Sequence, residues 1–263
     1  MSDGLGTAEP SDVAVAMVLD GLQVSLQPVV DLASGAVFAY EALARFPSQA
    51  GRPVEDVIAW AHVAGHGPAV EAACLRAALN RRGDLPDAVR LSVNLSPDMV
   101  DHPDVASTWD DDLDGVLVEI TEYRASRLTS LHDELARLRQ RGAAIAVDDA
   151  GTGHANLFRL TTIRPDYVKV DRTIVTNVRA SMAQQATLAE LVEFSRRLRA
   201  DVIAEGLETL EDLTAMADFD VDYGQGWIVG APADGAEPVS DVVIATCQQS
   251  RRHLVPRGDS ATE

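Results

Sequence analysis

Short apolar runs alternate with stretches of helical periodicity along most of this chain, and no other feature constrains its fold as strongly. Two apolar runs, residues 24–32 and 37–46, flank an Ala-Ser-Gly turn and predict a hairpin. Helical patterns separate most of the later runs, which is typical of parallel strands covered by helices. The later predicted strands are residues 90–95, 115–121, 143–147, 167–170, 201–204 and 227–229, and the predicted helices are residues 54–64, 69–80, 127–141, 181–200, 208–217 and 239–247.

The number of strands and the length of the chain together favour a barrel. The chain has 263 residues, close to the roughly 250 residues of one α/β barrel. The opening hairpin departs from a pure alternating pattern because its two strands run antiparallel. We therefore expect a modified (β/α)8 TIM-like barrel with one antiparallel strand. We expect it to span residues 15–248, between a disordered lead (1–14) and a disordered tail (249–263) that contains LVPRG, a stretch similar to an engineered protease site.

The charge of the chain argues against two classes of partner. Asp and Glu number 41 against 22 Lys and Arg, for a net charge of −19. The negative field of the protein should therefore repel nucleic-acid polymers and anionic membranes. No apolar run approaches the roughly 20 residues of a membrane span. The two cysteines, Cys74 and Cys247, lie far apart in sequence, so we expect a reducing, cytoplasmic location.

Oxygen-bearing side chains follow nearly every predicted strand. In a barrel these positions share the rim where active sites lie. The residues in question are Glu41, Asn94, Glu119, Glu122, Asp148, Asp149, Asp171, Glu205, Glu208 and Gln225. Any one of them taken alone reads as a helix cap or a solvated loop residue, but the joint pattern does not.

Carboxylates that converge on one rim need cations or raised pKa values. An all-oxygen ligand set favours hard ions, namely Mg²⁺ or Mn²⁺, with Ca²⁺ as a non-productive competitor. The neighbouring pair Asp148 and Asp149 suits two ions, because one carboxylate can bridge while the other binds the second ion. Two such ions would activate water for displacement at phosphorus.

Lys169 is the only lysine of the chain, and it lies near the end of a predicted strand. Codon bias explains the scarcity of lysine in general. A lysine that persists among arginines is a candidate for a task that needs a compact ammonium group. Lys169 would orient the attacking water or stabilise developing charge.

Two weaker motifs are set aside. GTGHAN from Gly151 begins like a dinucleotide-binding loop, but it lacks the third glycine. His62 and His66 have the spacing of a zinc pair, but VAGH lacks the catalytic glutamate and contains a glycine, so we expect a packing or surface role.

Several stretches together resemble the EAL domain family, the cyclic di-GMP-specific phosphodiesterases. YEALARF around Glu41 carries the three letters that name the family. The other matching stretches, in the order of the family, are QPVVD from Gln27, VNLSP around Asn94, EITE from Glu119, DDAGTG from Asp148, KVDR from Lys169, AEGLE from Ala204 and GQGW from Gly224.

The resemblance implies hydrolysis of cyclic di-GMP to linear pGpG with two Mg²⁺ or Mn²⁺ ions, inhibition by Ca²⁺, and a homodimer. It implies that Lys169, Glu41, Glu205 and Glu122 are catalytic residues, with Glu122 anchoring the loop after Asp149. It implies as metal ligands Glu41, Asn94, Glu119, Asp148, Asp149 and Glu205. At the substrate site it implies Gln27, Leu43, Arg45, Asp171, Glu208 and Gln225, with Arg45 on a phosphate.

Three positions depart from the family pattern: Ala150, His154 and Trp227. Ala150 and His154 lie in the loop that couples metal site and dimer contact in the family, so the turnover rate is open. Two other functions also stay open. One is an inactive EAL module that binds cyclic di-GMP or a protein. The other is a different metal-dependent barrel enzyme acting on a phosphorylated or carboxylated small molecule. No sensor segment is recognised, so we expect the chain either to act alone in the cytoplasm or to have a separate regulatory protein.

Overall fold

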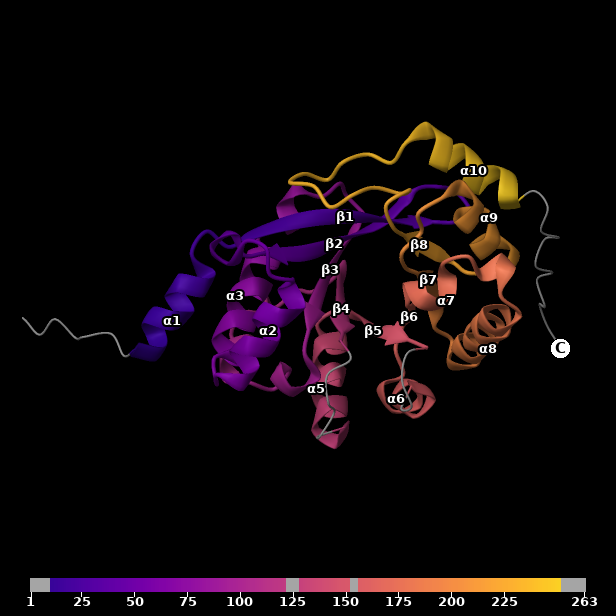
Figure 1. Ribbon diagram of the computed structural model, residues 1–263. Coiled ribbons are helices and arrows are strands. Elements are labelled where there is room, and N and C mark those ends of the chain that lie inside the picture. Colours follow the sequence, from indigo (N-terminus) through magenta and orange to yellow (C-terminus); the bar gives the residue numbers. More distant parts are fainter. Residues whose placement is uncertain (1–9, 122–127, 152–155, 252–263) are drawn as a thin grey trace, which may run out of the picture. The chain divides into compact units, whose positions relative to one another are not determined.

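The computed structural model describes residues 10–121, 128–151 and 156–251 (Figure 1). Within these residues eight strands follow one another in a closed barrel, in the order β1 to β8. Strand β1 pairs antiparallel with β8, whereas β3 with β4, β5 with β6, β6 with β7 and β7 with β8 pair parallel. The expected modified (β/α)8 barrel is therefore confirmed. The strands are β1 Gln23–Asp31, β2 Val37–Arg45, β3 Arg90–Leu95, β4 Val116–Ile120, β5 Ala144–Ala150, β6 Tyr167–Val170, β7 Asp201–Ala204 and β8 Tyr223–Gln225.

Helices connect most of the strands. The α-helices are α1 Pro10–Leu19, α2 Val54–Val63, α3 Gly67–Leu79, α4 Pro103–Ala106, α5 Leu128–Gln140, α6 Asn156–Ile163, α7 Arg172–Val175, α8 Met182–Leu198, α9 Leu210–Asp218 and α10 Asp241–Arg251. Short 3₁₀ turns lie at η1 Pro47–Gln49, η2 Arg82–Asp84, η3 Pro97–Met99 and η4 Val178–Ala180. None of the described helices combines the length and the apolar character that crossing a membrane requires.

Two predicted strands need correction. The stretch 227–229 forms a turn, and the last strand is Tyr223–Gln225 instead. The chain leaves the strand at Gly226, where an added Cβ would lie 2.2 Å from the backbone nitrogen of Leu207, so only glycine allows this close approach. Strand β5 continues past Val147 to Ala150 and therefore includes both aspartates of the DD pair.

Helix ends also differ from the prediction. Gly67 and Pro68, expected to separate two helices, form the first turn of α3, because proline fits the start of a helix. Helix α1 begins at Pro10, so residues 10–14 are helical although they were expected to belong to a disordered lead. Helix α10 extends to Arg251, beyond the expected domain end at 248.

The chain divides into two compact units that interleave along the sequence. The first unit comprises residues 1–26, 41–145 and 232–235, and the second comprises 27–40, 146–231 and 236–263. In the first unit a buried cluster joins α1, α2 and α3 through Val18, Phe46, Val57, Ala61 and Val70. In the second unit a larger core lies among α7, α8, α9, α10 and the strands β6 and β7.

A bulge interrupts the pairing of β5 with β6. Val147 pairs with Val168 and Ala150 pairs with Val170, so two aspartates lie opposite the single residue Lys169. Asp149 has a positive φ of 56°, in the left-handed region where aspartate is tolerated better than most residues. Bulges of this kind redirect side chains, and this one lies at the neighbouring aspartates Asp148 and Asp149.

Candidate functional site: two clusters of carboxylates

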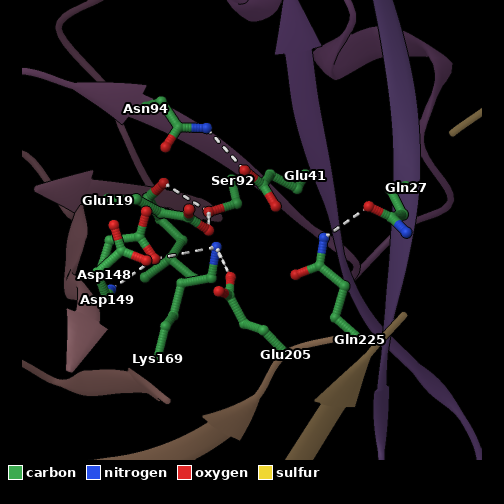
Figure 2. Close-up of polar contacts among 11 residues, drawn as sticks. Gln27, Glu41, Ser92, Asn94, Glu119, Asp148, Asp149, Lys169, Glu205 and Gln225 are labelled. Carbon is green, nitrogen blue, oxygen red and sulfur yellow. Dashed lines mark hydrogen bonds and ion pairs between the residues drawn. The ribbon is translucent and has the colours of Figure 1, made fainter. Parts of the chain in front are cut away.

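The buried lysine of β6 is the centre of the cluster in the second unit. Lys169 Nζ lies 2.6 Å from Glu205 Oε1 and 3.7 Å from Asp148 Oδ1, as Figure 2 shows. The Lys169 side chain is only 1% exposed, whereas Asp148 is 16% and Glu205 21% exposed. We call Asp148, Asp149, Lys169 and Glu205 the lysine cluster.

Three strands of the second unit supply this cluster. Asp148 and Asp149 lie in β5, Lys169 in β6, and Glu205 directly follows β7. Parallel pairing of β6 with β7 aligns Val170 with Ala204, so the chain passes from β7 into Glu205 beside the exit of β6. A buried ammonium group is costly without opposite charges nearby. The two carboxylates provide them.

The acids of the lysine cluster fit a divalent cation. Single carboxylate oxygens of Asp148, Asp149 and Glu205 all lie within 4.8 Å of one another. Three partly exposed oxygen donors at this separation suit hard ions such as Mg²⁺ and Mn²⁺. The Asp148 Oδ1 atom also accepts a 2.9 Å hydrogen bond from the Asp149 backbone N–H, which orients the first carboxylate.

The first unit holds a second cluster, in which neutral groups contact the acids. Asn94 Nδ2 donates to Glu41 Oε1 at 2.7 Å, and Ser92 Oγ donates to Glu119 Oε1 at 2.5 Å. Glu41 is 6% and Glu119 1% exposed. We call these four residues the neutral-donor cluster.

Strand register places the members of the neutral-donor cluster together. Strand β3 pairs parallel with β4, with Asn94 opposite Glu119 and Ser92 opposite Leu117. Ser92 and Asn94 are two residues apart in one strand and so face the same side. The two carboxylates and the amide are oxygen donors of the kind that a hard cation binds.

Ser92 is a residue that sequence reasoning missed. Its hydroxyl lies within hydrogen-bond distance of both the Glu119 carboxylate and the Leu117 carbonyl, and it is fully buried. Serine inside an apolar strand carries little signal by itself. The period of two that links it to Asn94 is the signal that could have found it.

A pair of glutamines joins the antiparallel strands of the second unit. Gln225 Nε2 donates to Gln27 Oε1 at 3.1 Å, and Gln27 Nε2 donates to the Gly230 carbonyl at 3.0 Å. The register of β1 with β8, which places Val29 opposite Gln225, brings the two amides within reach. Both residues were expected at the substrate site, and the structure holds them as one amide network.

The other expected substrate residues lie at different kinds of position. Leu43 and Arg45 are half-buried in β2, and Arg45 Nη1 donates to the Ala44 carbonyl at 2.9 Å. Asp171 Oδ1 caps α7 by accepting from the Thr173 backbone N–H at 2.9 Å. Glu208 is exposed just before α9. Glu122 and His154 lie outside the described residues.

The cysteines do not extend either ligand set. Burial raises the pKa of Cys74 to about 12, with a further contribution from the charge of Glu71. Burial likewise raises the pKa of Cys247 to about 11. Metals bind the thiolate form, so both thiols remain protonated packing groups at neutral pH.

Comparison with known proteins identifies relatives. The sequence profile of the EAL domain matches residues 11–232. The "Uncharacterized protein y4lL" of Sinorhizobium fredii is 30% identical over 83% of this chain and 28% of its own length. The "Cyclic di-GMP phosphodiesterase TpdA" of Vibrio parahaemolyticus is 27% identical over 78% of this chain and 36% of its own length. The chain thus spans about a third of these relatives.

Solved structures show the same fold. A manganese/cy-diGMP complex of Klebsiella pneumoniae BlrP1 at pH 6 is 30% identical, with a TM-score of 0.70 over 81% of this chain and 56% of that one. A calcium/cy-diGMP complex of BlrP1 at pH 8.0 is 25% identical, with a TM-score of 0.72 over 90% of this chain and 70% of that one. With a profile that matches most of its length, this chain belongs to the EAL domain family.

Proposed function

We propose that this chain hydrolyses cyclic di-GMP to linear pGpG in a reaction that depends on two divalent cations, Mg²⁺ or Mn²⁺. The lysine cluster is the observation that carries the proposal, because a buried ammonium 2.6 Å from Glu205 lies beside three acids with the spacing of a cation site. Two relatives support the choice of substrate: TpdA is a cyclic di-GMP phosphodiesterase, and BlrP1 was solved with cy-diGMP.

The chain's own residues have separable tasks in this proposal. Asp148, Asp149 and Glu205 are the proposed cation ligands of the second unit, and Glu41, Asn94 and Glu119 are the proposed cation ligands of the first unit. Bound divalent cations polarise the phosphate and lower the pKa of a bound water. The Lys169 ammonium donates hydrogen bonds to the water and to charge that develops during the reaction. Arg45 is proposed to bind a substrate phosphate, and Gln27 and Leu43 are proposed to contact the substrate.

The product defines which bonds change. Water adds its oxygen to one phosphorus of the cyclic dinucleotide, and the bond from that phosphorus to the 3′ oxygen breaks. The 3′ oxygen leaves as a hydroxyl after it gains a proton, and the 5′ phosphate remains on the linear product pGpG. Glu41, Glu205 and Glu122 are proposed as catalytic acids with Lys169. Asp171, Glu208 and Gln225 are proposed to support substrate binding.

A nucleotide assay tests the proposal. Purified protein is incubated with cyclic di-GMP and MnCl₂ or MgCl₂, with and without chelator, and products are separated by chromatography. We expect pGpG only with added metal, and inhibition by Ca²⁺, which prefers 6–8 ligands in a flexible geometry. Glu190→Gln, an exposed acid of α8, is the control and keeps full turnover. Binding of cyclic di-GMP without product, with either metal, would show an inactive receptor module instead.

Three further features belong to the proposal, of which the family resemblance implies only the first. A homodimer is expected, and light scattering of the purified chain measures its mass directly. A cytoplasmic location with a separate regulatory protein is also proposed. A fluorescent fusion and affinity capture from the native host test these two points. A monomer with full turnover would show that the activity does not require a dimer.

A further inference from the structure

A carboxylate of helix α3 in the first unit is buried. Glu71 is 7% exposed, and each of its oxygens has a partner. Its Oε2 accepts a 3.0 Å hydrogen bond from the backbone N–H of Ser96, and its Oε1 is hydrogen-bonded to His62 Nε2 of α2. The proposed reaction assigns no role to this carboxylate, although burying it is costly unless it is paired.

The ring of His62 is fixed in place by its neighbours. The His62 side chain is 10% exposed. A Cβ added at Gly67, the first residue of α3, would lie 2.8 Å from His62 Nδ1 and 3.0 Å from Cε1. The ring therefore occupies the space that a side chain at position 67 would fill. Glycine at this position lets the imidazole reach Glu71.

Charge strengthens the contact between His62 and Glu71. The hydrogen bond from Glu71 raises the pKa of His62 above its usual value, and the charges of Glu71 and Asp98 act in the same direction, while burial opposes them. Protonated His62 then balances the buried carboxylate. Two neighbouring elements thus hold Glu71 in one orientation, toward the backbone of Ser96.

Ser96 lies at the exit of β3, where the neutral-donor cluster begins. It precedes η3, and it is two residues beyond Asn94, whose amide donates to Glu41. A hydrogen bond to the backbone N–H of Ser96 fixes the path of the chain as it leaves the strand. That path sets where Asn94 lies, and partners behind metal ligands commonly control ligand orientation in this way.

We propose that Glu71, held by His62, is a positioning residue that orients Asn94 for metal binding through the backbone of Ser96. This inference rests on the proposed function, because it assigns Asn94 to a metal. Gly67 is part of the device, since it makes room for the imidazole. The device acts through the first unit alone and leaves the lysine cluster untouched.

Direct binding of Mn²⁺ tests the proposal without reference to turnover. Free Mn²⁺ is titrated with wild type, Glu71→Gln and His62→Gln, and its electron paramagnetic resonance signal reports the unbound fraction. We expect one Mn²⁺ to bind about 10-fold more weakly in both variants, which is the low end of the effect seen for such partners. The Mn²⁺ held by the lysine cluster keeps its affinity. Glu55→Gln, an exposed acid on the same helix as His62, is the matched control and binds as wild type does.

A double variant separates positioning from general loosening of the fold. If Glu71 acts through Asn94, then Glu71→Gln has no further effect on Mn²⁺ affinity once Asn94→Ala is present, because coupled residues are not additive. Additive losses of affinity would overturn the proposal. Thermal unfolding without metal, measured on the same variants, identifies any that do not fold.

A pair of glycine variants supplies a test that leaves both Glu71 and His62 in place. Gly67→Ala displaces the imidazole and should weaken the same Mn²⁺ site, whereas an added Cβ at Gly83 meets nothing within 4 Å, so Gly83→Ala should not. If wild type binds no Mn²⁺, the proposed function itself fails. If wild type binds but the folded Glu71, His62 and Gly67 variants bind equally well, only this inference fails.

Discussion

The neutral-donor cluster and the lysine cluster hold their carboxylates with different chemistry. In the first, an amide and a hydroxyl contact Glu41 and Glu119. In the second, one buried ammonium lies 2.6 Å from Glu205 and 3.7 Å from Asp148. A neutral donor satisfies a carboxylate oxygen but adds no positive charge, whereas an ammonium does both. The lysine cluster thus includes a positive charge, whereas the two hydrogen bonds of the neutral-donor cluster add none, so we expect a bound cation to contribute more to the neutral-donor cluster.

The difference predicts how each cluster responds when one partner is removed. Loss of the ammonium changes the charge of the lysine cluster, so its effect on chemistry should be large. Loss of a neutral donor changes only orientation and hydrogen bonding, so its effect should be smaller.

Lys169→Met should reduce turnover of cyclic di-GMP by about 10²–10³-fold, as removal of one charge-stabilising donor does in other enzymes. Mn²⁺ binding should persist, because Asp148, Asp149 and Glu205 remain. Product chromatography and titration calorimetry measure the two effects. Lys169→Arg is the companion variant, and it should stay impaired because a planar guanidinium does not replace a compact ammonium. Turnover within threefold of wild type in the Met variant would remove Lys169 from the mechanism.

Metal should stabilise the neutral-donor cluster more than the lysine cluster. At about 100 times the dissociation constant of a site, Mn²⁺ should raise the free energy of unfolding of wild type by about 2.7 kcal/mol for that site. Glu41→Gln should lose a large part of this gain, since it removes a negatively charged ligand of the cation. Thermal melting with and without Mn²⁺ measures the difference. An unchanged gain in the Gln variant would mean that Glu41 does not bind metal.

Ser92→Ala should weaken Mn²⁺ binding about 10-fold through misorientation of Glu119. Its hydroxyl donates to that carboxylate at 2.5 Å, and alanine cannot. Ser195→Ala is the matched control, because this serine is equally buried but donates to the Leu191 carbonyl of its own helix. Equal Mn²⁺ affinity in the two variants would show that Ser92 only fills space.

His62→Gln should lower the stability of the fold by about 1 kcal/mol at pH 6, the size of a typical hydrogen-bond contribution. The pKa of His62 is raised in the folded state, chiefly by the hydrogen bond to Glu71. His62 therefore contributes its full stabilisation at pH values below its pKa in the unfolded state, and this contribution is lost as the pH rises through its pKa in the folded state. Denaturant unfolding of wild type and of the variant across pH 5–9 measures the difference between their free energies of unfolding. If this difference grew toward high pH, the contact between His62 and Glu71 would not be the source of the stabilisation.

Local patterns predicted most of the elements. Residues 90–95, 167–170 and 201–204 were expected as strands, and the structure places β3, β6 and β7 at those residues. Apolar runs of four to six residues bounded by turn residues are a property of the nearby sequence, so no tertiary information was needed. The strand-end positions of Asp148, Lys169 and Glu205 followed from the same reasoning.

Errors arose where a tertiary contact decides the backbone. The last strand ends at Gln225 because Gly226 packs against the backbone of Leu207, which lies about twenty positions away in sequence. The bulge opposite Lys169 depends on the pairing between two strands, so the sequence of either strand alone does not predict it. Ser92 and Glu71 gained roles only through the partners that the fold brought to them.

The sequence by itself determined the alternation of strands and helices, the oxygen-rich character of the strand ends and the single lysine among them, because side-chain type and periodicity are local properties. Three contacts could be known only from the tertiary structure: Lys169 lies between Asp148 and Glu205, Ser92 donates a hydrogen bond to Glu119, and Glu71 accepts one from the backbone of Ser96. Those outcomes depend on strand register and helix packing, which bring together residues that are distant along the chain.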